Sequence, residues 1–513
     1  MRPSRVGFGV LLHLVFSIGS SVVRGDYHWP SPFIDTLEGL LYEGKQEGLP
    51  DRAVDFVAQL LRCEPRVNNE SIAADWIRFA YHDMATHNID DGTGGLDNSI
   101  TMELDRDESK FDFIDFPNKY LSYSDTTAMG VVLATVECGG PVIAYRGGRI
   151  DAKFPGPPGV PVPEQSAEDF IETFRKQGFT KEEMIALVAC GHTLGGVRNP
   201  DFPTLVPPGD IEFENNIKLF DGTPQFDNTI VTSYLDGTTE NLLVVGANGN
   251  TTLTSDLRVF GSDGNVTMKS LADPDHFAAT CASLLGRMID TVPRNVTLTD
   301  FIHPLPVKVA GVQLAPGNED HLALNLTLRL SNNARQVTLH WADRDSESCS
   351  SGACSAAPIN STLVSTRLLQ ALGLSPVKYT FSTPIANTSV SKFWFEVDGK
   401  IENNGGSGYV IEQDRILFAP DRGAFGLLLK IVAAVRNDST PSAVWMDTYQ
   451  RDGVSTVERH PPVNLTLDES LPAAAGYNFY SASIPGSDLT LDLFAEIDGK
   501  VYEEEFRDTH FMA

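Results

Sequence analysis

Apolar side chains recur at three- and four-residue spacing through the first 300 residues of the chain, the pattern of helices with one buried face. Several of these segments begin with Ser, Thr or Asp, which favour a helix N-cap, and several end in Gly. Long Gly- and Pro-rich connections separate them, and loops of that length in a helical domain are usually functional. We therefore expect a mainly helical domain over residues 36–300. Its helices are expected in the segments TLEGLLYEG, DRAVDFVAQLLR, SIAADWIRFAYHDM, SDTTAMGVVLATVECG, SAEDFIETFRKQG, TKEEMIALVACGHTLGG and DPDHFAATCASLLGRMI.

The pattern changes after about residue 300 to the strict alternation of half-buried strands, as in HLALNLTLRLS and LTLDLFAEIDGKV. The segment FEVDGKIEN at 395–403 recurs as AEIDGKVYE at 495–503, and the Asp-Gly pair in each is typical of a hairpin turn. We predict two β-sandwich-like modules, residues 301–420 and 421–513. Their tryptophans are expected in the cores rather than on a sugar-stacking surface. These tryptophans are Trp341, Trp394 and Trp445.

The N-terminus has the pattern of a secretory signal peptide. Arg2 and Arg5 precede the apolar run VGFGVLLHLVFSIG, and small residues follow it. The run is short for a membrane span, so cleavage is favoured over an uncleaved anchor. We expect removal of a signal peptide over residues 1–25 and secretion to the extracellular space.

Sequons and cysteines agree with export. The chain contains six cysteines, an even number that fits an oxidising compartment, and Cys349 and Cys354 are close enough to close a small loop. The pairing of Cys63, Cys138, Cys190 and Cys281 cannot be deduced from spacing. Nine Asn-x-Ser/Thr sequons are typical of a secreted glycoprotein. They begin at Asn69, Asn250, Asn265, Asn295, Asn325, Asn360, Asn387, Asn437 and Asn464.

The net charge of the chain limits the classes of molecule that it can bind. The formal net charge is −29, with 68 acidic against 39 basic side chains, and no Lys/Arg cluster offsets it. Such a surface excludes nucleic acid and anionic membrane as partners. We expect no nucleic-acid partner and no membrane contact once the signal peptide is removed.

Two histidines in the helical half stand in chemically suggestive surroundings. Arg78 and His82 are four residues apart and share one face of a predicted helix, whereas His192 ends another helix and Asp256 follows downstream. A single buried histidine is more often a satisfied core residue than a ligand. Together, the four residues match the needs of a haem iron between two helices. One imidazole binds the iron, a carboxylate orients that imidazole, and a second imidazole faces the peroxide.

Over roughly residues 50–290 the chain resembles the secretory haem peroxidases of the plant, fungal and bacterial superfamily, closest to the fungal class II type. The family's distal motif Arg-x-x-aromatic-His-Asp is matched at residues 78–83. The segments GGLDNSI, LVACGHTLGG, LFDGTPQFDN and TSDLRVF follow in the family's order. The resemblance implies a multidomain protein with a mainly α haem-peroxidase domain followed by the two β-sandwich-like modules. It also implies haem b and two calcium ions as cofactors.

The resemblance gives the site residues their roles. His192 would be the axial ligand of the haem iron, and Asp256 would give that imidazole anionic character. His82 would take the proton of hydrogen peroxide and return it to the leaving oxygen. Arg78 would stabilise the negative charge that develops as the O–O bond breaks.

Two aromatic residues complete the expected haem pocket. Tyr81 stands where the family often has Phe or Trp, so it could become a radical site or serve as a wall of the pocket. Phe220 is expected beside the proximal histidine. Since it is not an indole, a radical cation is expected on the porphyrin rather than on a proximal side chain.

The calcium ligands also come from the resemblance, and oxygen-rich sets of this kind suit a hard cation. Asp83, Gly95, Asp97 and Ser99 would form the first site. Thr193, Asp221, Thr223 and Asp227 would form the second, whose loop is about one residue shorter than the family pattern.

The chain departs from the family in its distal region. The family asparagine that positions the distal imidazole has no match at the expected spacing in ELDRDESKFDFIDFPNKY. Asp112, Asp115 or Asn118 could substitute for it. This absence is the main support for an alternative function, a haem-free or catalytically weakened secreted glycoprotein with a binding or cell-wall role.

The specialised substrate sites of the family are not matched either. The positions compared with its manganese ligands hold Glu70, Ala74 and Arg198, and the position of its surface tryptophan holds Leu187. We therefore expect hydrogen peroxide and phenolic or other small aromatic reductants as substrates, with one-electron oxidation at the haem edge. A zinc hydrolase is disfavoured because no His-Glu-x-x-His spacing occurs. The C-terminal modules could contact polysaccharide.

Overall fold

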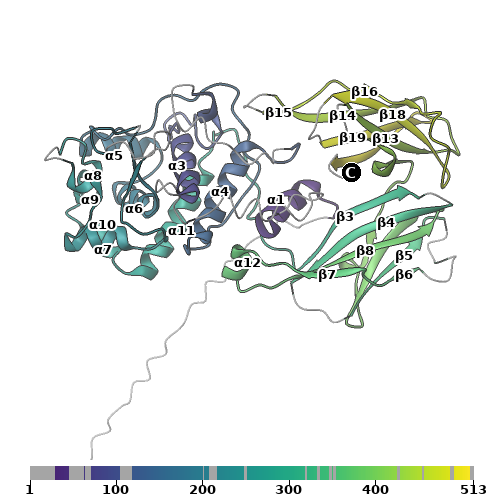
Figure 1. The fold of residues 1–513 in the computed structure, drawn as a ribbon, viewed down its shortest axis with the longest axis horizontal. Coiled ribbons are helices and arrows are strands. Elements are labelled where there is room, and N and C mark those ends of the chain that lie inside the picture. The colour runs from purple at the N-terminus through teal and green to yellow at the C-terminus, as the bar shows by residue number, and fades with distance from the viewer. Residues whose placement is uncertain are drawn as a thin grey trace, which may run out of the picture.

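The computed structural model describes residues 29–44, 63, 71–103, 118–199, 201–206, 216–247, 251–317, 320–331, 336–345, 349, 354–424, 428–452, 456–485 and 490–508. The predicted signal peptide and the predicted helix DRAVDFVAQLLR lie outside these residues. Figure 1 shows a helical domain on the left and two strand-rich modules on the right. The predicted fold class, a mainly helical domain followed by two β-modules, is confirmed.

The helices of the first domain start where the sequence supplies capping side chains. Ser71, Ser122, Ser166, Thr180 and Asp273 each accept a hydrogen bond from a backbone N–H in the first turn. The helices are α1 Pro32–Glu43, α3 Ile72–Met84, α4 Tyr123–Glu137, α5 Ala167–Lys176, α6 Lys181–His192, α7 Thr229–Asp236, α8 Leu242–Val245, α9 Ser255–Gly261, α10 Val266–Ser270 and α11 Pro274–Asp290, with a 3₁₀ turn η1 at Ser99–Met102. A two-stranded antiparallel sheet, β1 Gly196–Arg198 with β2 Ile217–Leu219, interrupts the all-helical pattern directly after α6.

The helices that carry the candidate site pack closely on one another. α3 contacts both α4 and α6, and α11 contacts α6. The approach of α3 to α4 requires a glycine, because a Cβ at Gly130 would lie 2.1 Å from the ring of Trp76. This contact fixes the face of α3 that carries Arg78 and His82.

The C-terminal half contains two β-modules, each with two antiparallel sheets. The sheet orders are β3-β4-β8-β7 and β10-β9-β5-β6 in the first module, where β11 also pairs with β9. In the second module they are β12-β13-β18-β17 and β15-β14-β19-β20, where β16 also pairs with β14. The strands are β3 Val307–Pro316, β4 His321–Leu330, β5 Val337–Asp343, β6 Ser355–Ala356, β7 Asn360–Leu363, β8 Val377–Ala386, β9 Val390–Val397, β10 Lys400–Glu402, β11 Tyr409–Val410, β12 Ile416–Phe418, β13 Leu428–Arg436, β14 Ala443–Asp452, β15 Thr456–Arg459, β16 Val463–Asn464, β17 Thr466–Leu467, β18 Tyr477–Pro485, β19 Thr490–Ile497 and β20 Lys500–Asp508.

The repeated Asp-Gly pairs form the predicted hairpins. Asp398-Gly399 joins β9 to β10, and Asp498-Gly499 joins β19 to β20. All four residues have positive φ, as a two-residue hairpin turn with the twist of its strands requires.

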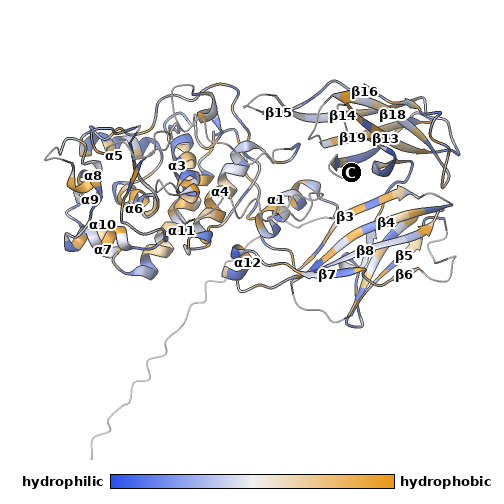
Figure 2. Ribbon diagram, in the orientation of Figure 1, coloured by the Kyte–Doolittle hydropathy of each residue, from blue (hydrophilic) through white to orange (hydrophobic). Residues whose placement is uncertain are grey.

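The two modules share a buried sheet. Along β13, Ile431, Ala433 and Val435 belong to the core of the second module, whereas Val432 and Ala434 pack into the core of the first. A strand buried on both faces reads as a continuous apolar run rather than an alternating one, which explains the segment IVAAV at 431–435. By contrast, β4 shows the alternation of a strand with one buried face (Figure 2). Because β12 pairs with β13, the second module begins before the expected boundary at residue 421.

Helix α1 joins the helical domain to the first β-module. Its apolar face packs into the helical core, and Glu38 on the same helix forms ion pairs with Lys308 of β3 and Arg329 of β4. A second carboxylate, Glu43, binds Arg329 and Lys378. Burial alone would raise the pKa of Glu38, but the two cations hold it below its ordinary value.

Three disulfides are formed. Cys349 pairs with Cys354, as the short spacing predicted. Cys63 pairs with Cys138, which lies directly after α4, and Cys190 of α6 pairs with Cys281 of α11. None of the helices described here is both long and apolar enough to span a membrane.

Candidate active site

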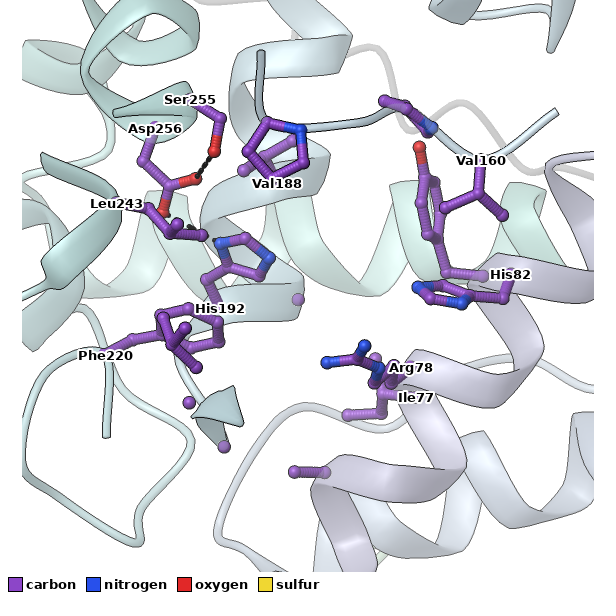
Figure 3. Close-up of a pocket in the computed structure, with 18 of the residues that line it drawn as sticks. Ile77, Arg78, His82, Val160, Val188, His192, Phe220, Leu243, Ser255 and Asp256 are labelled. Carbon is purple, nitrogen blue, oxygen red and sulfur yellow. Dashed lines mark hydrogen bonds and ion pairs between the residues drawn. The ribbon is translucent and has the colours of Figure 1, made fainter. Parts of the chain in front are cut away.

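A cavity of about 570 Å³ opens between α3 and α6 of the helical domain, within the ~300–1,000 Å³ range of cofactor and ligand pockets. Arg78, Tyr81 and His82 line it from α3, and His192 lines it from the end of α6. Figure 3 shows the two histidines pointing into the cavity from opposite sides. The walls between them are largely apolar, formed by side chains such as Phe174, Leu187, Val188, Phe220 and Leu243.

The proximal side contains a hydrogen-bonded chain. Nδ1 of His192 lies 2.9 Å from Oδ2 of Asp256, the second residue of α9. A carboxylate accepts only, so Nδ1 must donate its proton and Nε2 keeps its lone pair. Asn241, fully buried, donates its side-chain N–H to the same Asp256 oxygen at 2.7 Å. The imidazole is therefore held in the tautomer that can bind a metal through Nε2.

Phe220 packs on the other side of the proximal imidazole. The rings of His192 and Phe220 are stacked, with centroids 4.1 Å apart and planes inclined by 12° (Figure 3). The backbone places Phe220 there because its N–H donates to the carbonyl of Gly195, at the turn between α6 and β1. The position expected for this residue agrees with this contact.

The distal side combines a cation with an imidazole. Arg78 and His82 lie on one face of α3, one turn apart, and both line the cavity. Nη2 of Arg78 forms an ion pair with Oδ2 of Asp201 at 2.9 Å. Asp201 lies in the loop after β1 and lines the same cavity.

Tyr81 forms part of the cavity wall. Its ring stacks on Phe174 of α5, and its hydroxyl donates to Oε1 of Gln177 over 3.4 Å. Burial raises the pKa of Tyr81 above its ordinary value. Gln177 is itself buried and donates to the carbonyl of Gly159, so the hydroxyl is held by a fixed amide.

Only one of the three candidates for the missing distal asparagine lies within the described residues. Asn118 is buried, but its Oδ1 accepts the N–H groups of Tyr120 and Leu121 in a tight turn. It does not line the cavity that contains His82. Asp112 and Asp115 lie outside the described residues.

The first predicted calcium cluster acts as a loop anchor. Asp83 is fully buried, and its two oxygens accept four hydrogen bonds, from the backbone of Asp97, Asn98 and Ile100 and from the hydroxyl of Ser99. Burial and the nearby Asp97 carboxylate raise the pKa of Asp83 well above its ordinary value. A carboxylate has about four acceptor positions, so this arrangement leaves none for a cation. The Asp83 oxygens are thus used within the loop, and a calcium ion at the first cluster stays a prediction.

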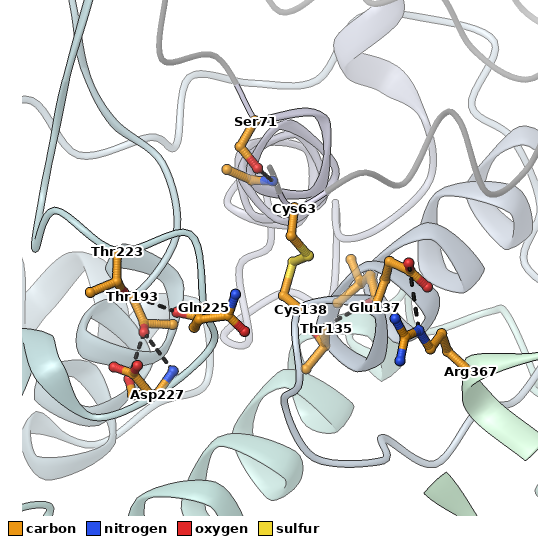
Figure 4. The surroundings of a disulfide bond; sticks show 12 residues. Cys63, Ser71, Thr135, Glu137, Cys138, Thr193, Thr223, Gln225, Asp227 and Arg367 are labelled. Carbon is orange, nitrogen blue, oxygen red and sulfur yellow. Dashed lines mark hydrogen bonds and ion pairs between the residues drawn. A yellow bond between two sulfur atoms is a disulfide. The ribbon is translucent and has the colours of Figure 1, made fainter. Parts of the chain in front are cut away.

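The second predicted cluster has an unused oxygen. Asp221 accepts the N–H and hydroxyl of Thr223 with Oδ1, while its buried Oδ2 has no hydrogen-bond partner among the described residues. Thr193 donates its hydroxyl to the backbone carbonyl of Asp227 at 2.6 Å (Figure 4). Burial and the Asp227 carboxylate raise the pKa of Asp221 to about 6. Among described residues no group of three or more His, Cys, Asp or Glu side chains forms a metal site, so hydroxyl and carbonyl oxygens would complete this one.

The cavity fits a flat, iron-containing cofactor that itself carries carboxylate groups. His192 offers Nε2, and a Cβ built at the neighbouring Gly191 meets no atom within 4 Å, so the wall beside the ligand is open. The buried Nε of Arg198 lines the cavity and has no hydrogen-bond partner among the described residues, so this guanidinium is suited to a cofactor carboxylate. Imidazole ligation opposite a polar distal group is the donor arrangement of haem in peroxidases.

Sequence reasoning did not identify three residues of this site. Asn241, Asp201 and Gln177 contact predicted residues that lie 15, 123 and 96 positions away in the chain. Asn241 follows a Thr-rich turn and caps α8, a signal that favours a helix start and nothing more. No local pattern pointed to Asp201 or Gln177.

Comparison with known proteins places the cavity in a recognised domain. Residues 55–272 match the family model described as "Peroxidase". A WSC domain-containing protein of Arthroderma benhamiae is 38% identical over 323 residues, which is 60% of this chain and 44% of that protein. That alignment is longer than the matched peroxidase segment, so the similarity extends beyond it.

Plant and fungal peroxidases are also similar over shorter regions. A putative L-ascorbate peroxidase 6 of Arabidopsis thaliana is 33% identical over 146 residues, 25% of this chain and 43% of that protein. A mitochondrial cytochrome c peroxidase of Cryptococcus neoformans is 32% identical over 208 residues, 37% of this chain and 52% of that protein. The chain thus spans about half the length of the relatives it matches.

Proposed function

Because residues 55–272 form a domain of the peroxidase family, we propose that the protein is a haem-dependent peroxidase. It reduces hydrogen peroxide and oxidises phenolic or other small aromatic donors by one-electron steps at the haem edge. The observation that supports this most is the cavity shared by two histidines. One is hydrogen-bonded to a buried carboxylate, and the other stands one helical turn from an arginine.

The proximal and distal residues of the cavity would act on opposite faces of the cofactor. Bound haem would supply the iron that takes up peroxide and the oxidising equivalents passed to the donor. His192 would hold that iron through Nε2, while its Nδ1 proton stays on the hydrogen bond to Asp256. Arg198 would bind a propionate. Stacking on Phe220 fixes the plane of the proximal ring.

On the distal face His82 acts as the proton carrier. Its imidazole takes the proton of hydrogen peroxide and gives it to the oxygen that leaves as water. Arg78 stabilises the negative charge that builds up during O–O cleavage, as a permanent cation in a partly enclosed cavity. Tyr81 and Phe174 exclude water on one side.

The donor is a small aromatic molecule rather than manganese. Arg198 and Leu187 both line the cavity, so the specialised positions are occupied by a cation and by a buried aliphatic side chain. A cation at this wall disfavours Mn²⁺. The apolar lining suits the ring of a phenol.

Secretion is proposed from the N-terminal pattern, with support from the disulfides and sequons. Three disulfides are formed, which is typical of oxidising compartments. Among the nine sequons, several asparagines are exposed and available to a glycan: Asn295, Asn360, Asn437 and Asn464.

We propose one calcium ion, at the second cluster. The buried Oδ2 of Asp221 and the adjacent Asp227 carboxylate would gain a cation partner, and hydroxyl and carbonyl oxygens of the same loop complete a hard donor set. The first cluster lacks this support, since hydrogen bonds within its loop satisfy Asp83.

Polysaccharide contact through the β-modules is favoured by two aromatic pairs. Trp341 is buried in the core as expected, but Trp394 and Trp445 are only half-buried, so the core expectation is wrong for these two. His340 stacks on Trp394 at 6.0 Å, and Trp445 stacks on Phe494 at 5.3 Å, at cross-strand positions of the two modules. Flat aromatic pairs of this kind can receive sugar rings.

We expect the double variant Trp394→Ala, Trp445→Ala to lose binding to fungal-wall polysaccharide. Val410→Ala is the control.

Haem binding is tested by titrating the purified protein with haemin and recording its absorption. We expect a saturable Soret band in the wild type. His192→Ala should lose that band or shift it, because the axial nitrogen is gone. A folded wild-type protein that takes up no haem would instead support the alternative, a secreted glycoprotein with a binding or cell-wall role.

A further inference from the structure

The ion pair between Arg78 and Asp201 lies in the lining of the cavity and is partly exposed. Nη2 of Arg78 and Oδ2 of Asp201 are 2.9 Å apart, and the two side chains are 26% and 21% exposed. Both line the cavity with His82 and His192. Arg78 comes from α3 and Asp201 from the loop after β1, so the pair joins the distal helix to a segment that follows the proximal one.

The carboxylate of Asp201 pairs with Arg78 rather than with Arg198. Arg198 is only three residues before Asp201 and lines the same cavity, yet its buried Nε has no hydrogen-bond partner among the described residues. Asp201 therefore pairs with the cation on the distal helix although another guanidinium follows α6 close by. Its position in the fold, rather than proximity in sequence, selects Arg78.

A paired guanidinium is a weaker partner for an anion. Part of its charge is compensated, and at least one N–H is directed to the carboxylate instead of to a ligand. An anion that is to be stabilised by Arg78 must compete with Asp201. The cost of that competition is set by the strength of a partly exposed ion pair, which is modest.

We infer that Asp201 is a positioning residue for Arg78. It holds the guanidinium at the cavity edge and releases it when an anionic ligand occupies the distal side. This inference rests on the proposed function, because the ligand in question is one bound at the haem. It assigns Asp201 no contact with the reacting atoms.

Fluoride binding to the ferric, haem-loaded protein measures the competition without turnover. Fluoride is a small anion that accepts hydrogen bonds, and its binding is followed by absorption. Asp201→Asn should bind fluoride about three- to tenfold more tightly than the wild type, which corresponds to ~0.6–1.4 kcal/mol. Asp201→Glu keeps the carboxylate and should stay near the wild-type affinity.

Two further variants separate this role from a general effect of charge. Asp90→Asn removes the same charge from the exposed pair that Asp90 forms with Arg175, outside the cavity, and should leave fluoride affinity unchanged. In an Arg78→Leu background, Asp201→Asn should have no effect, because the two substitutions act through one interaction.

The outcomes distinguish the inference from the proposed function. Equal affinities of the wild type and Asp201→Asn, or weaker binding by the variant, would overturn the positioning role while haem binding stands. The same holds if the effect persists in the Arg78→Leu background. A protein that takes up no haem would overturn both.

Discussion

Tyr81 shows how the neighbours of a side chain decide its chemistry. A phenol that loses an electron also loses its proton, so a radical site needs a base. The hydroxyl of Tyr81 instead donates to the amide oxygen of Gln177, which cannot take a proton, and burial raises the pKa of Tyr81. Of the two roles that the sequence allowed, the contacts favour the wall of the pocket.

The Tyr81→Phe variant tests this assignment. Donor oxidation should stay within about twofold of the wild type, because the ring and its stacking on Phe174 are retained. The free energy of unfolding should fall by about 0.5–1.5 kcal/mol for the lost hydrogen bond. Steady-state rates and urea unfolding measure the two effects. A tenfold loss of activity in a folded variant would show that the hydroxyl takes part in the reaction.

Asp256 is expected to act through the proximal imidazole. In Asp256→Asn the charge is lost while the shape remains, so haem is retained but the electron-rich character of His192 is not. The rate of reaction with hydrogen peroxide should fall roughly 10–100-fold, the usual effect of removing such a partner. Stopped-flow absorption measures it, with Asp236→Asn, at the exposed last residue of α7, as the control.

The residues that the sequence predicted at this site lie in short motifs. Arg78, Tyr81 and His82 share one helical turn, and spacing alone places them on one face. Asn241 and Asp201 could not be found in this way, because their partners are distant in sequence and only the fold brings them together.

At the scale of an element, the loop between β2 and α7 makes the free energy of unfolding depend on pH. The pKa of Asp221 is about 6 in the folded state against an ordinary 3.8, mainly because of burial and then the Asp227 carboxylate. Between about pH 4 and pH 6 the folded protein binds more protons than the unfolded one. Its free energy of unfolding therefore falls as the pH rises through that window.

Asp221→Asn should remove this contribution. Without calcium, the variant should gain stability relative to the wild type as the pH rises from 4 to 6, and with saturating calcium the order should reverse at pH 7. Thermal unfolding at several pH values, with and without a chelator, gives the result. A difference between the two proteins that is independent of both pH and calcium would contradict the assignment of this loop.

Strands could be predicted from the sequence where local turn residues and the alternation of side chains determine them. The hairpins at Asp398 and Asp498 follow from turn residues with positive φ. The boundary between the two β-modules was harder to predict from the sequence, because β12 is short and its pairing with β13 is set by tertiary contacts. A strand buried on both faces also lacks the alternation that marks a strand.

At the scale of the whole molecule, α1 binds the two halves together. Glu38 is completely buried between Lys308 and Arg329 while Leu37, Leu40 and Leu41 of the same helix pack into the helical core. In Figure 1 the helix lies between the helical domain and the first β-module. The two halves are therefore expected to unfold in one transition.

Removing the carboxylate should uncouple them. Glu38→Gln removes the carboxylate partner of the buried Lys308 and one of the two carboxylate partners of Arg329, and should cost about 3–5 kcal/mol, the usual penalty for breaking a buried ion pair. Calorimetry should then resolve two transitions in place of one. Glu240→Gln, which breaks the exposed pair with Lys218, is the matched control and should leave the profile unchanged. A single unshifted transition in Glu38→Gln would show that the halves are joined by other contacts.

The most direct test of the central claim is the hydrogen peroxide-dependent oxidation of a phenol by the haem-loaded protein, compared with His82→Leu. The wild type should oxidise the donor about 10²–10⁴ times faster than the variant, the range of a positioned proton carrier. Both proteins should bind haem equally, since His192 is unchanged. Equal rates, or a haem-loaded wild type that oxidises no phenol, would contradict the assignment of this cavity as a peroxidase active site.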